Sequence, residues 1–148
     1  MEQIEEATVE DIPQLADLLG MLFSQEADFS PDLEKQVRGL RLIVDAPERG
    51  RIFVARSDGQ IVGTVCLLFT VSTAEGAADC WLEDMVVRPD CRAAGLGSRL
   101  LDHAIAFAKD HGFVRITLLT DRANAGAIQF YRRRGFQPSS MTPLRLHL

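Results

Sequence analysis

An arginine and two glycines lie directly before an amphipathic helix in the stretch RPDCRAAGLGSRLLDHAIAFAK, residues 88–109. Glycine lets the backbone approach a ligand closely, and the first turn of a helix carries N–H groups that have no intrahelical partner. Such a turn, with the positive end of the helix dipole and an arginine beside it, suits an anion, most often a phosphate. Residues 92–98 are therefore predicted to bind phosphate, and a plain tight turn is the alternative.

Two familiar phosphate motifs do not fit this stretch. A P-loop continues with Gly-Lys-Ser/Thr, whereas here Gly97 is followed by Ser98 and Arg99. A dinucleotide fingerprint needs a third small residue at its sixth position, where this chain has Leu100. The predicted anion site is therefore of another kind.

Composition limits the class of protein. A chain of 148 residues fits one domain, 1–148, and a pI near 5.2 with formal net charge −5 argues against nucleic-acid binding. No apolar run reaches membrane-spanning length, and the acidic start is unlike a secretory signal. The three cysteines have no metal-ligand spacing, which favours reduced thiols in a cytoplasmic protein that holds no metal.

The elements that must position the anion site follow from hydrophobic periodicity and turn residues. Helical spacing and caps predict helices near 12–22, 31–44, 96–110 and 124–134. Apolar and β-branched runs predict a hairpin of strands 51–56 and 61–72, and further strands at 80–87, 114–120 and 141–148. The chain is therefore predicted to be a mixed α/β protein.

The order of these motifs resembles the GNAT superfamily of acyl-CoA-dependent N-acetyltransferases. A strand with Glu83 precedes Arg-x-x-Gly-x-Gly and a helix, and a strand, Asn124 and a helix with Tyr131 then lead to Gly-Phe. The resemblance is strongest over 81–136, and Ala93 departs from it because many members have glycine after the arginine. It implies a central, mostly antiparallel sheet whose middle strands diverge after Glu83, with helices on both faces.

The resemblance implies acetyl-CoA as co-substrate. Its pyrophosphate would lie over residues 92–98, here called the glycine loop, and its pantetheine arm would follow the strand before that loop. An N-cap is the alternative role of Asn124. The implied cofactor-binding residues are Met85, Val86, Val87, Arg92, Ala93, Ala94, Gly95, Leu96, Gly97, Ser98 and Asn124.

Two catalytic residues are also implied by the resemblance. Glu83 matches the general base, with Asp84 as an alternative and a plain rim carboxylate as the other reading. Alternation along a strand places Glu83 on one face with Met85, and Asp84 on the other. Tyr131 matches the acid that protonates the leaving thiolate, or it packs in the core. Direct transfer needs no acyl-cysteine intermediate.

The amine acceptor is expected between the first two helices and at the loop before the third strand. The implied acceptor residues are Phe23, Glu26, Asp28 and Phe29, with Asp32, Phe69 and Glu75 as further members. Such a set suits a cationic amine with an apolar part, and polyamine, aminoglycoside, amino acid and peptide N-terminus all stay open. A homodimer paired through C-terminal strands is a further expectation, and a non-catalytic acyl-CoA sensor is the alternative function.

Overall fold

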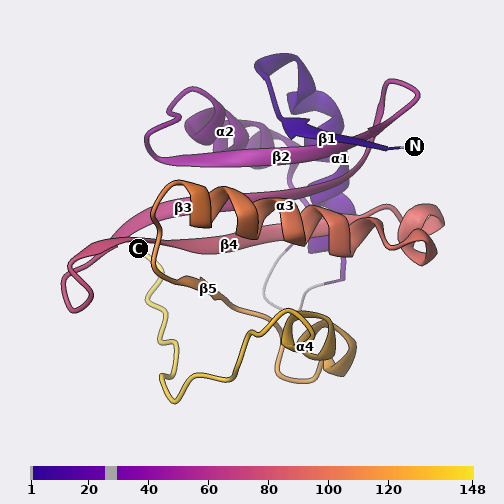
Figure 1. Cartoon of the computed structure of the whole chain (residues 1–148). Helices are drawn as coiled ribbons and strands as arrows, with labels where there is room; N and C mark the ends of the chain where they lie inside the picture. The colour runs from indigo at the N-terminus through magenta and orange to yellow at the C-terminus, as the bar shows by residue number, and fades with distance from the viewer. Residues whose placement is uncertain (1, 26–29) are drawn as a thin grey trace.

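The computed structural model describes residues 2–25 and 30–148, and over these residues its sheet has five strands in the order β1-β2-β3-β4-β5 (Figure 1). Neighbouring strands are antiparallel except β4 and β5, which are parallel. The strands are β1 Gln3–Glu6, β2 Gly50–Ser57, β3 Gln60–Ser72, β4 Ala77–Val87 and β5 Ile116–Leu118. The helices are α1 Ile12–Phe23, α2 Leu33–Val44, α3 Leu96–Asp110 and α4 Ala125–Arg132, with short 3-10 turns η1 Val9–Asp11 and η2 Pro89–Ala94.

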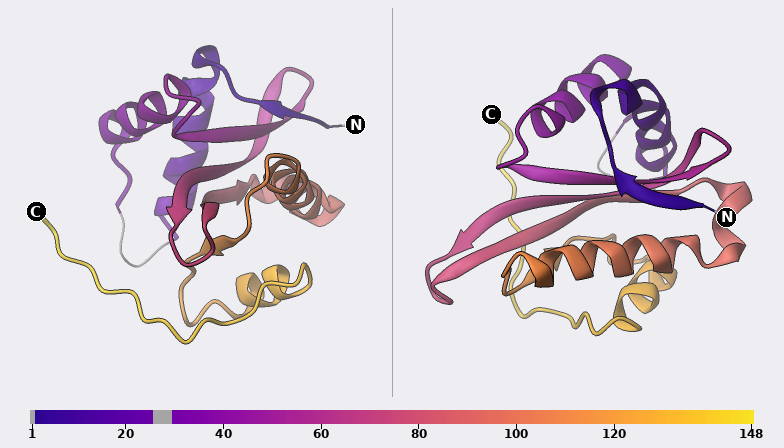
Figure 2. Two further views of the ribbon diagram at one scale, coloured as in Figure 1. Left: turned by 60° about the vertical axis from the view of Figure 1, so that its left-hand side comes forward. Right: turned by 45° about the horizontal axis from the view of Figure 1, so that its top comes forward.

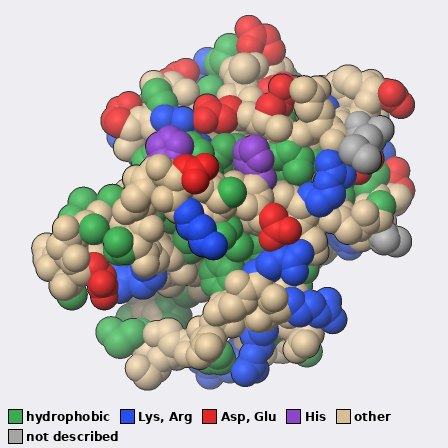
Figure 3. All heavy atoms as spheres, in the orientation of Figure 1, with side chains coloured by type: hydrophobic (Ala, Val, Ile, Leu, Met, Phe, Trp, Pro, Cys, Tyr) green, Lys and Arg blue, Asp and Glu red, His purple; other side chains and the backbone are tan. Residues whose placement is uncertain are grey.

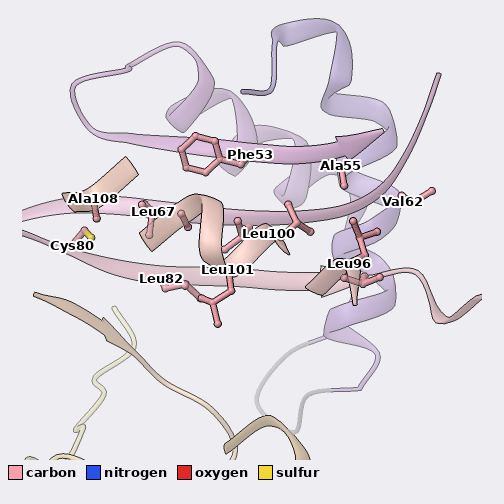
Figure 4. Packing of buried hydrophobic residues seen from close by; sticks show 13 residues of the cluster. Phe53, Ala55, Val62, Leu67, Cys80, Leu82, Leu96, Leu100, Leu101 and Ala108 are labelled. Atoms are coloured by element: carbon pink, nitrogen blue, oxygen red, sulfur yellow. The ribbon is translucent and has the colours of Figure 1, made fainter. Parts of the chain in front are cut away.

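Helices cover both faces of the sheet, as Figures 1 and 2 show. One apolar cluster lies under α1 and α2, and the other lies under α3 and reaches the aromatic side chains of α4. Figure 4 shows Phe53, Leu67 and Leu82 of the sheet packed against Leu100 and Leu101 of α3. The predicted mixed α/β fold with a mostly antiparallel sheet is confirmed. None of the described helices is long and apolar enough to cross a lipid bilayer.

The predicted hairpin is formed by β2 and β3. Its two turn residues, Asp58 and Gly59, have φ values of 51° and 78°. Two successive positive φ angles define the turn whose twist matches that of the flanking strands. The Asp-Gly pair therefore fixes the register of these two strands.

Strand β1 has no signal in the sequence. Its residues are mostly polar, and it pairs antiparallel with β2 at the edge of the sheet. Ion pairs hold it there: Arg51 bonds Glu6 at 2.7 Å, and Arg56 bonds both Glu5 and the buried Asp11. A charged edge strand discourages pairing with other chains, but it hides the alternation by which strands are predicted.

The predicted strand at 141–148 is wrong for the single chain. This segment has no regular secondary structure, and Figure 2 shows it leading away from the body of the molecule. Its side chains alternate as in a strand, yet Leu144 and Leu146 are 94% and 83% exposed. A strand needs a neighbour to take its backbone hydrogen bonds, and no described strand lies beside this one.

The predicted divergence of the middle strands is present between β4 and β5. The two strands pair only over Cys80–Leu82 of β4, while β4 itself continues to Val87. The outer edge of β4 beyond Leu82 is therefore open, and this opening lies next to the glycine loop that follows the strand.

Candidate functional site

A β-bulge in β4 lies at the centre of the candidate site. Glu83 pairs with Cys66 of β3 and Val86 pairs with Thr64, so two residues of β4 oppose one residue between these pairs. Asp84, the first of the two, has φ 53°, in the left-handed region that few residues other than glycine adopt. Aspartate tolerates this conformation better than most side chains. The bulge redirects the strand where the two carboxylates lie.

The bulge places both carboxylates on the same face of the sheet. Glu83 lies opposite Cys66, which belongs to the cluster under α1 and α2, and Asp84 lines a pocket between those helices. Met85 packs against the cluster under α3, on the other face. The expectation that Glu83 shares a face with Met85 is therefore wrong, because simple alternation does not cross a bulge.

Asp84 has the electrostatic properties of a general base. Burial is the main cause that raises its pKa to about 6, and the nearby carboxylate of Glu83 adds to the effect. A carboxylate with this pKa is ionised at neutral pH and still accepts a proton more readily than an exposed aspartate does. Perturbed groups of this kind concentrate at functional sites. No group of side chains able to hold a metal ion occurs among the described residues.

The pocket that Asp84 lines has a volume of about 490 Å³, and we refer to it as the α1–α2 pocket. It combines a wall of apolar side chains with a few polar groups. Its lining residues are Leu19, Phe23, Ser30, Pro31, Asp32, Lys35, Gln36, Gly39, Leu40, Ile43 and Asp84.

The expected acceptor residues are only partly brought together. Phe23 and Asp32 line the α1–α2 pocket, whereas Glu26, Asp28 and Phe29 lie outside the described residues. Phe69 is on the opposite face, with its ring centroid 4.8 Å from that of Phe113, so it does not line this pocket. Glu75, in the turn between β3 and β4, does not line the pocket either.

A buried glutamine fixes the wall of the pocket. Gln36 Nε2 donates to the carbonyl of Ala16 in α1 at 2.7 Å, and its Oε1 accepts from the backbone N–H of Asp32 at 2.7 Å. The Asp32 carboxylate caps α2 by accepting from Lys35 N at 3.2 Å. These bonds join α1 to the start of α2. The sequence did not reveal Gln36, because a single glutamine in an amphipathic helix carries no pattern.

Backbone groups of β4 face the opening toward β5. Arg88 N donates to Val62 O on β3 at 2.8 Å, so alternation directs the backbone groups of Met85 and Val87 to the other edge. The side chain of Arg92 already reaches this edge, because its Nε donates to Val87 O at 2.9 Å. That bond uses one of the five guanidinium donors and leaves the others for a ligand.

The glycine loop ends in an uncapped helix N-terminus. Gly95 has φ 76°, which only glycine adopts without strain, and it directs the chain from η2 into α3. The first intrahelical bond runs from Arg99 N to Gly95 O at 3.2 Å. The N–H groups of Leu96, Gly97 and Ser98 precede it, and no side chain of residues 2–25 or 30–148 caps them. Figure 3, in the orientation of Figure 1, shows most of the visible Lys and Arg side chains in the middle and lower part of the view, over α3 and α4.

Gly97 brings three parts of the predicted cofactor site together. A Cβ added at this residue would lie 3.5 Å from the ring of Phe130 in α4 and 3.7 Å from Val87 in β4. The start of α3, the end of β4 and the middle of α4 therefore meet at one point. Both distances are ordinary contacts, so the fold itself accepts a methyl group here.

Tyr131 is half-buried beside the same point. Its ring makes edge contacts with Phe130 and Phe136, at centroid distances of 5.1 and 5.7 Å, and it packs, like Met85, against the cluster under α3. Its chemical role stays a prediction. Asn124 caps α4, with Oδ1 accepting from Ala127 N at 3.0 Å, so the N-cap interpretation is confirmed.

Comparisons with known proteins agree with this geometry. The model of the acetyltransferase (GNAT) family matches residues 13–136. An uncharacterized N-acetyltransferase of Methanocaldococcus jannaschii is 36% identical over 86 residues, which are 57% of this chain and 38% of that protein. The amino-acid acetyltransferase of Azotobacter vinelandii is 30% identical over 143 residues, 97% of this chain and 29% of that protein. The chain thus spans well under half of these relatives.

A solved structure has the same fold. The predicted acetyltransferase of Clostridium acetobutylicum, determined with acetyl-CoA, superimposes with a TM-score of 0.81 at 20% identity and covers 99% of this chain and 96% of its own. An integron cassette protein from a salt-marsh metagenome gives a TM-score of 0.85 at 27% identity, with coverage of 99% and 90%.

Proposed function

Because this chain belongs to the acetyltransferase (GNAT) family, we propose that it transfers the acetyl group of acetyl-CoA to a primary amine, by direct attack in a ternary complex. One observation carries the proposal. At the bulge of β4, the carboxylate of Asp84, whose pKa is raised, lines a pocket, and the open edge of β4 and the uncapped N-terminus of α3 lie beside it. The acetyl-CoA in the related Clostridium acetobutylicum structure supports the choice of donor.

The reaction divides between the two sides of β4. The amine nitrogen attacks the thioester carbonyl carbon, a C–N bond forms and the C–S bond breaks. The carboxylate takes the proton that the nitrogen loses, and the tyrosine hydroxyl gives a proton to the departing thiolate. Backbone N–H groups at the open edge stabilise the negative charge that develops on the carbonyl oxygen.

Asp84 is the better placed of the two carboxylates to act as base. It lines the pocket, and its pKa is raised to about 6. Glu83, which the family resemblance favours, lies on the same face and raises that pKa through its charge. We therefore assign proton removal to Asp84, and to Glu83 the tuning of its neighbour.

Acetyl-CoA is proposed to lie along β4 with its pyrophosphate over the start of α3. The N–H groups of residues 96–98 and the guanidinium of Arg92 supply the positive charge, and the backbone of Met85 and Val87 bonds the pantetheine arm. Asn124 is engaged in capping α4, and a contact with the pantetheine is left to its remaining amide donors.

Changing the loop is expected to weaken acetyl-CoA binding. The double variant Arg92→Glu with Gly97→Val places a negative charge on the loop and a larger side chain against Phe130 and Val87, where the loop meets β4 and α4. Its affinity should fall at least tenfold, or about 1.4 kcal/mol, in isothermal calorimetry. Arg38→Glu, an exposed charge reversal on α2, is the matched control and should bind normally. Equal affinity of the parent, the double variant and Arg38→Glu for acetyl-CoA would contradict the assignment of the cofactor site to this loop.

The alternative function is a non-catalytic acyl-CoA sensor. It shares the cofactor site but needs neither the raised pKa of Asp84 nor a pocket on the other face of β4. An assay of thiol release from acetyl-CoA with a panel of polyamines, aminoglycosides, amino acids and peptides separates the two. Tight acetyl-CoA binding without release for any amine would favour the sensor.

A homodimer joined by the segment 141–148 is also proposed. This segment alternates exposed leucines with Arg145 and His147, and β5 has one described neighbour, β4. Beside β5 lies a hollow of about 340 Å³ whose walls include Ile105, Phe113 and Ile116. The segment of one copy is proposed to pair with β5 of a second copy and to fill this hollow.

Shortening the chain tests this pairing. Deleting 141–148 is expected to convert a dimer to a monomer in sedimentation velocity runs at several concentrations, because the leucine side chains would no longer be buried. Arg38→Glu serves again as a variant that leaves the state unchanged. A full chain that sediments as a monomer throughout the concentration range would refute the dimer.

The location proposed for the protein is the cytoplasm, where acetyl-CoA is available. All three cysteines are free thiols, as expected in a reducing compartment.

A further inference from the structure

The α1–α2 pocket carries charges of both signs. Asp84 lies at the sheet, and Lys35 lines the pocket from the first turn of α2. Of the other polar side chains of the wall, Gln36 joins the two helices and Asp32, a second carboxylate, caps α2. Ser30 lines the pocket as well. Among the described lining residues Lys35 is the single cation.

Lys35 has no carboxylate partner in the described part of the chain. Its backbone N–H bonds Asp32, but no ion pair of its ammonium group within 4 Å occurs over 2–25 and 30–148. An ammonium group on the rim of a pocket with apolar walls is suited to bind the carboxylate of a ligand. A polyamine or an aminoglycoside has no carboxylate for this ammonium group to bind.

The apolar wall indicates a third group of the ligand, in addition to the amine and the carboxylate. Leu19, Phe23, Leu40 and Ile43 come from the facing sides of α1 and α2. A side chain buried among them is stabilised by the removal of apolar surface from water. The pocket therefore offers one place for an amine, one for a carboxylate and one for an apolar group.

On the basis of the proposed function, we propose that the acceptor is an amino acid with an apolar side chain. Its amine faces Asp84, its carboxylate binds the ammonium of Lys35, and its side chain packs on the apolar wall. The neutral amine attacks acetyl-CoA as described above, and the product is the N-acetylamino acid with free coenzyme A. Lys35 touches the substrate but not the reacting atoms, so it sets specificity and not the chemical step.

Three matched acceptors test this assignment. Leucine, leucinamide and 3-methylbutylamine share the amine and the branched side chain, and only leucine has a carboxylate. The wild-type protein should use leucine with a kcat/KM at least about tenfold above either of the others, as expected for one charged hydrogen bond. Lys35→Met keeps the length of the side chain, removes its charge, and should abolish this preference mainly through KM.

Two further variants act as controls. Lys35→Arg keeps the charge and should retain most of the preference for leucine. Lys109→Met removes an exposed lysine that lines the hollow beside β5, outside the α1–α2 pocket, and should leave the preference for leucine unchanged. The proposal is overturned if leucinamide, which mimics a peptide N-terminus, or 3-methylbutylamine is used as well as leucine, or if Lys35→Met leaves the ratio unchanged.

The outcome separates this inference from the proposed function. Acetylation of polyamines or aminoglycosides with none of leucine would overturn the amino-acid acceptor and leave the acetyltransferase in place. Absence of product with every amine, while acetyl-CoA still binds, would overturn both.

Discussion

Replacing Asp84 with asparagine should lower kcat/KM for acetyl transfer by about 10²–10⁴, the usual range for loss of a general base. Asparagine has nearly the same shape and tolerates the left-handed backbone of this position, so the bulge should persist. In the wild-type protein the rate should fall as pH drops through about 6, where the carboxyl takes up a proton. The variant should lack this dependence.

The same substitution should stabilise the fold at neutral pH. The pKa of Asp84 is about 6 in the folded chain, above the ordinary value of 3.8. The folded state therefore holds the proton more tightly, and the resulting stability is complete below pH 4 and lost as pH rises through 6. The amide of the Asp84→Asn variant carries no charge to desolvate. Its free energy of unfolding at pH 7 should exceed that of the parent by about 2 to 3 kcal/mol, with little difference near pH 4.

Glu83→Gln is the matched control for the base. If Asp84 removes the proton, this variant should keep most of its activity, and the acid limb of its pH profile should move to lower pH because a neighbouring charge is gone. A larger loss in Glu83→Gln than in Asp84→Asn would assign the base to Glu83 instead.

The second large effect is expected at Tyr131. A thiolate with a free pKa of about 8.5 leaves more readily when a phenol donates a proton to it. Tyr131→Phe keeps the ring and its edge contacts with Phe130 and Phe136 but removes the hydroxyl. We expect kcat to fall by about 10²–10⁴, with acetyl-CoA affinity and melting temperature nearly unchanged.

Kinetics, calorimetry and thermal unfolding of this variant must be read together. If kcat stays within about twofold of the parent, the acid lies elsewhere and Tyr131 is a packing residue. If the melting temperature falls sharply, the hydroxyl has a structural role, and the loss of rate cannot be ascribed to proton donation.

Local chemistry explains which elements the sequence predicted. Asp58 and Gly59 predict a hairpin turn, because this residue pair readily adopts the positive φ angles that such a turn needs. Gly95 and Gly97 predict a loop that leads into a helix. Strand β1 was missed because its stability comes from ion pairs with residues about 45 to 51 positions away. The apolar residues of the segment 141–148 predict a strand, but pairing also requires a free edge within reach.

The candidate site shows the same division. The predicted phosphate loop, 92–98, lies within one continuous stretch, so its residues and spacing predict it, and the family resemblance implies the rest of the cofactor site. Its acceptor half depends on the bulge at Asp84 and on the clamp made by Gln36, which joins residues 20 positions apart. Neither feature has a pattern in the sequence, because both arise from the register of β3 with β4 and from the packing of α1 on α2.

The most direct test of the account is to identify the product. The protein is incubated with acetyl-CoA labelled in its acetyl group and with the amine panel, and the mixture is analysed by mass spectrometry. We predict a labelled N-acetyl amide and free coenzyme A in equal amounts with wild-type protein, and much slower formation of both with Asp84→Asn. Binding of acetyl-CoA without any labelled amide would contradict the account.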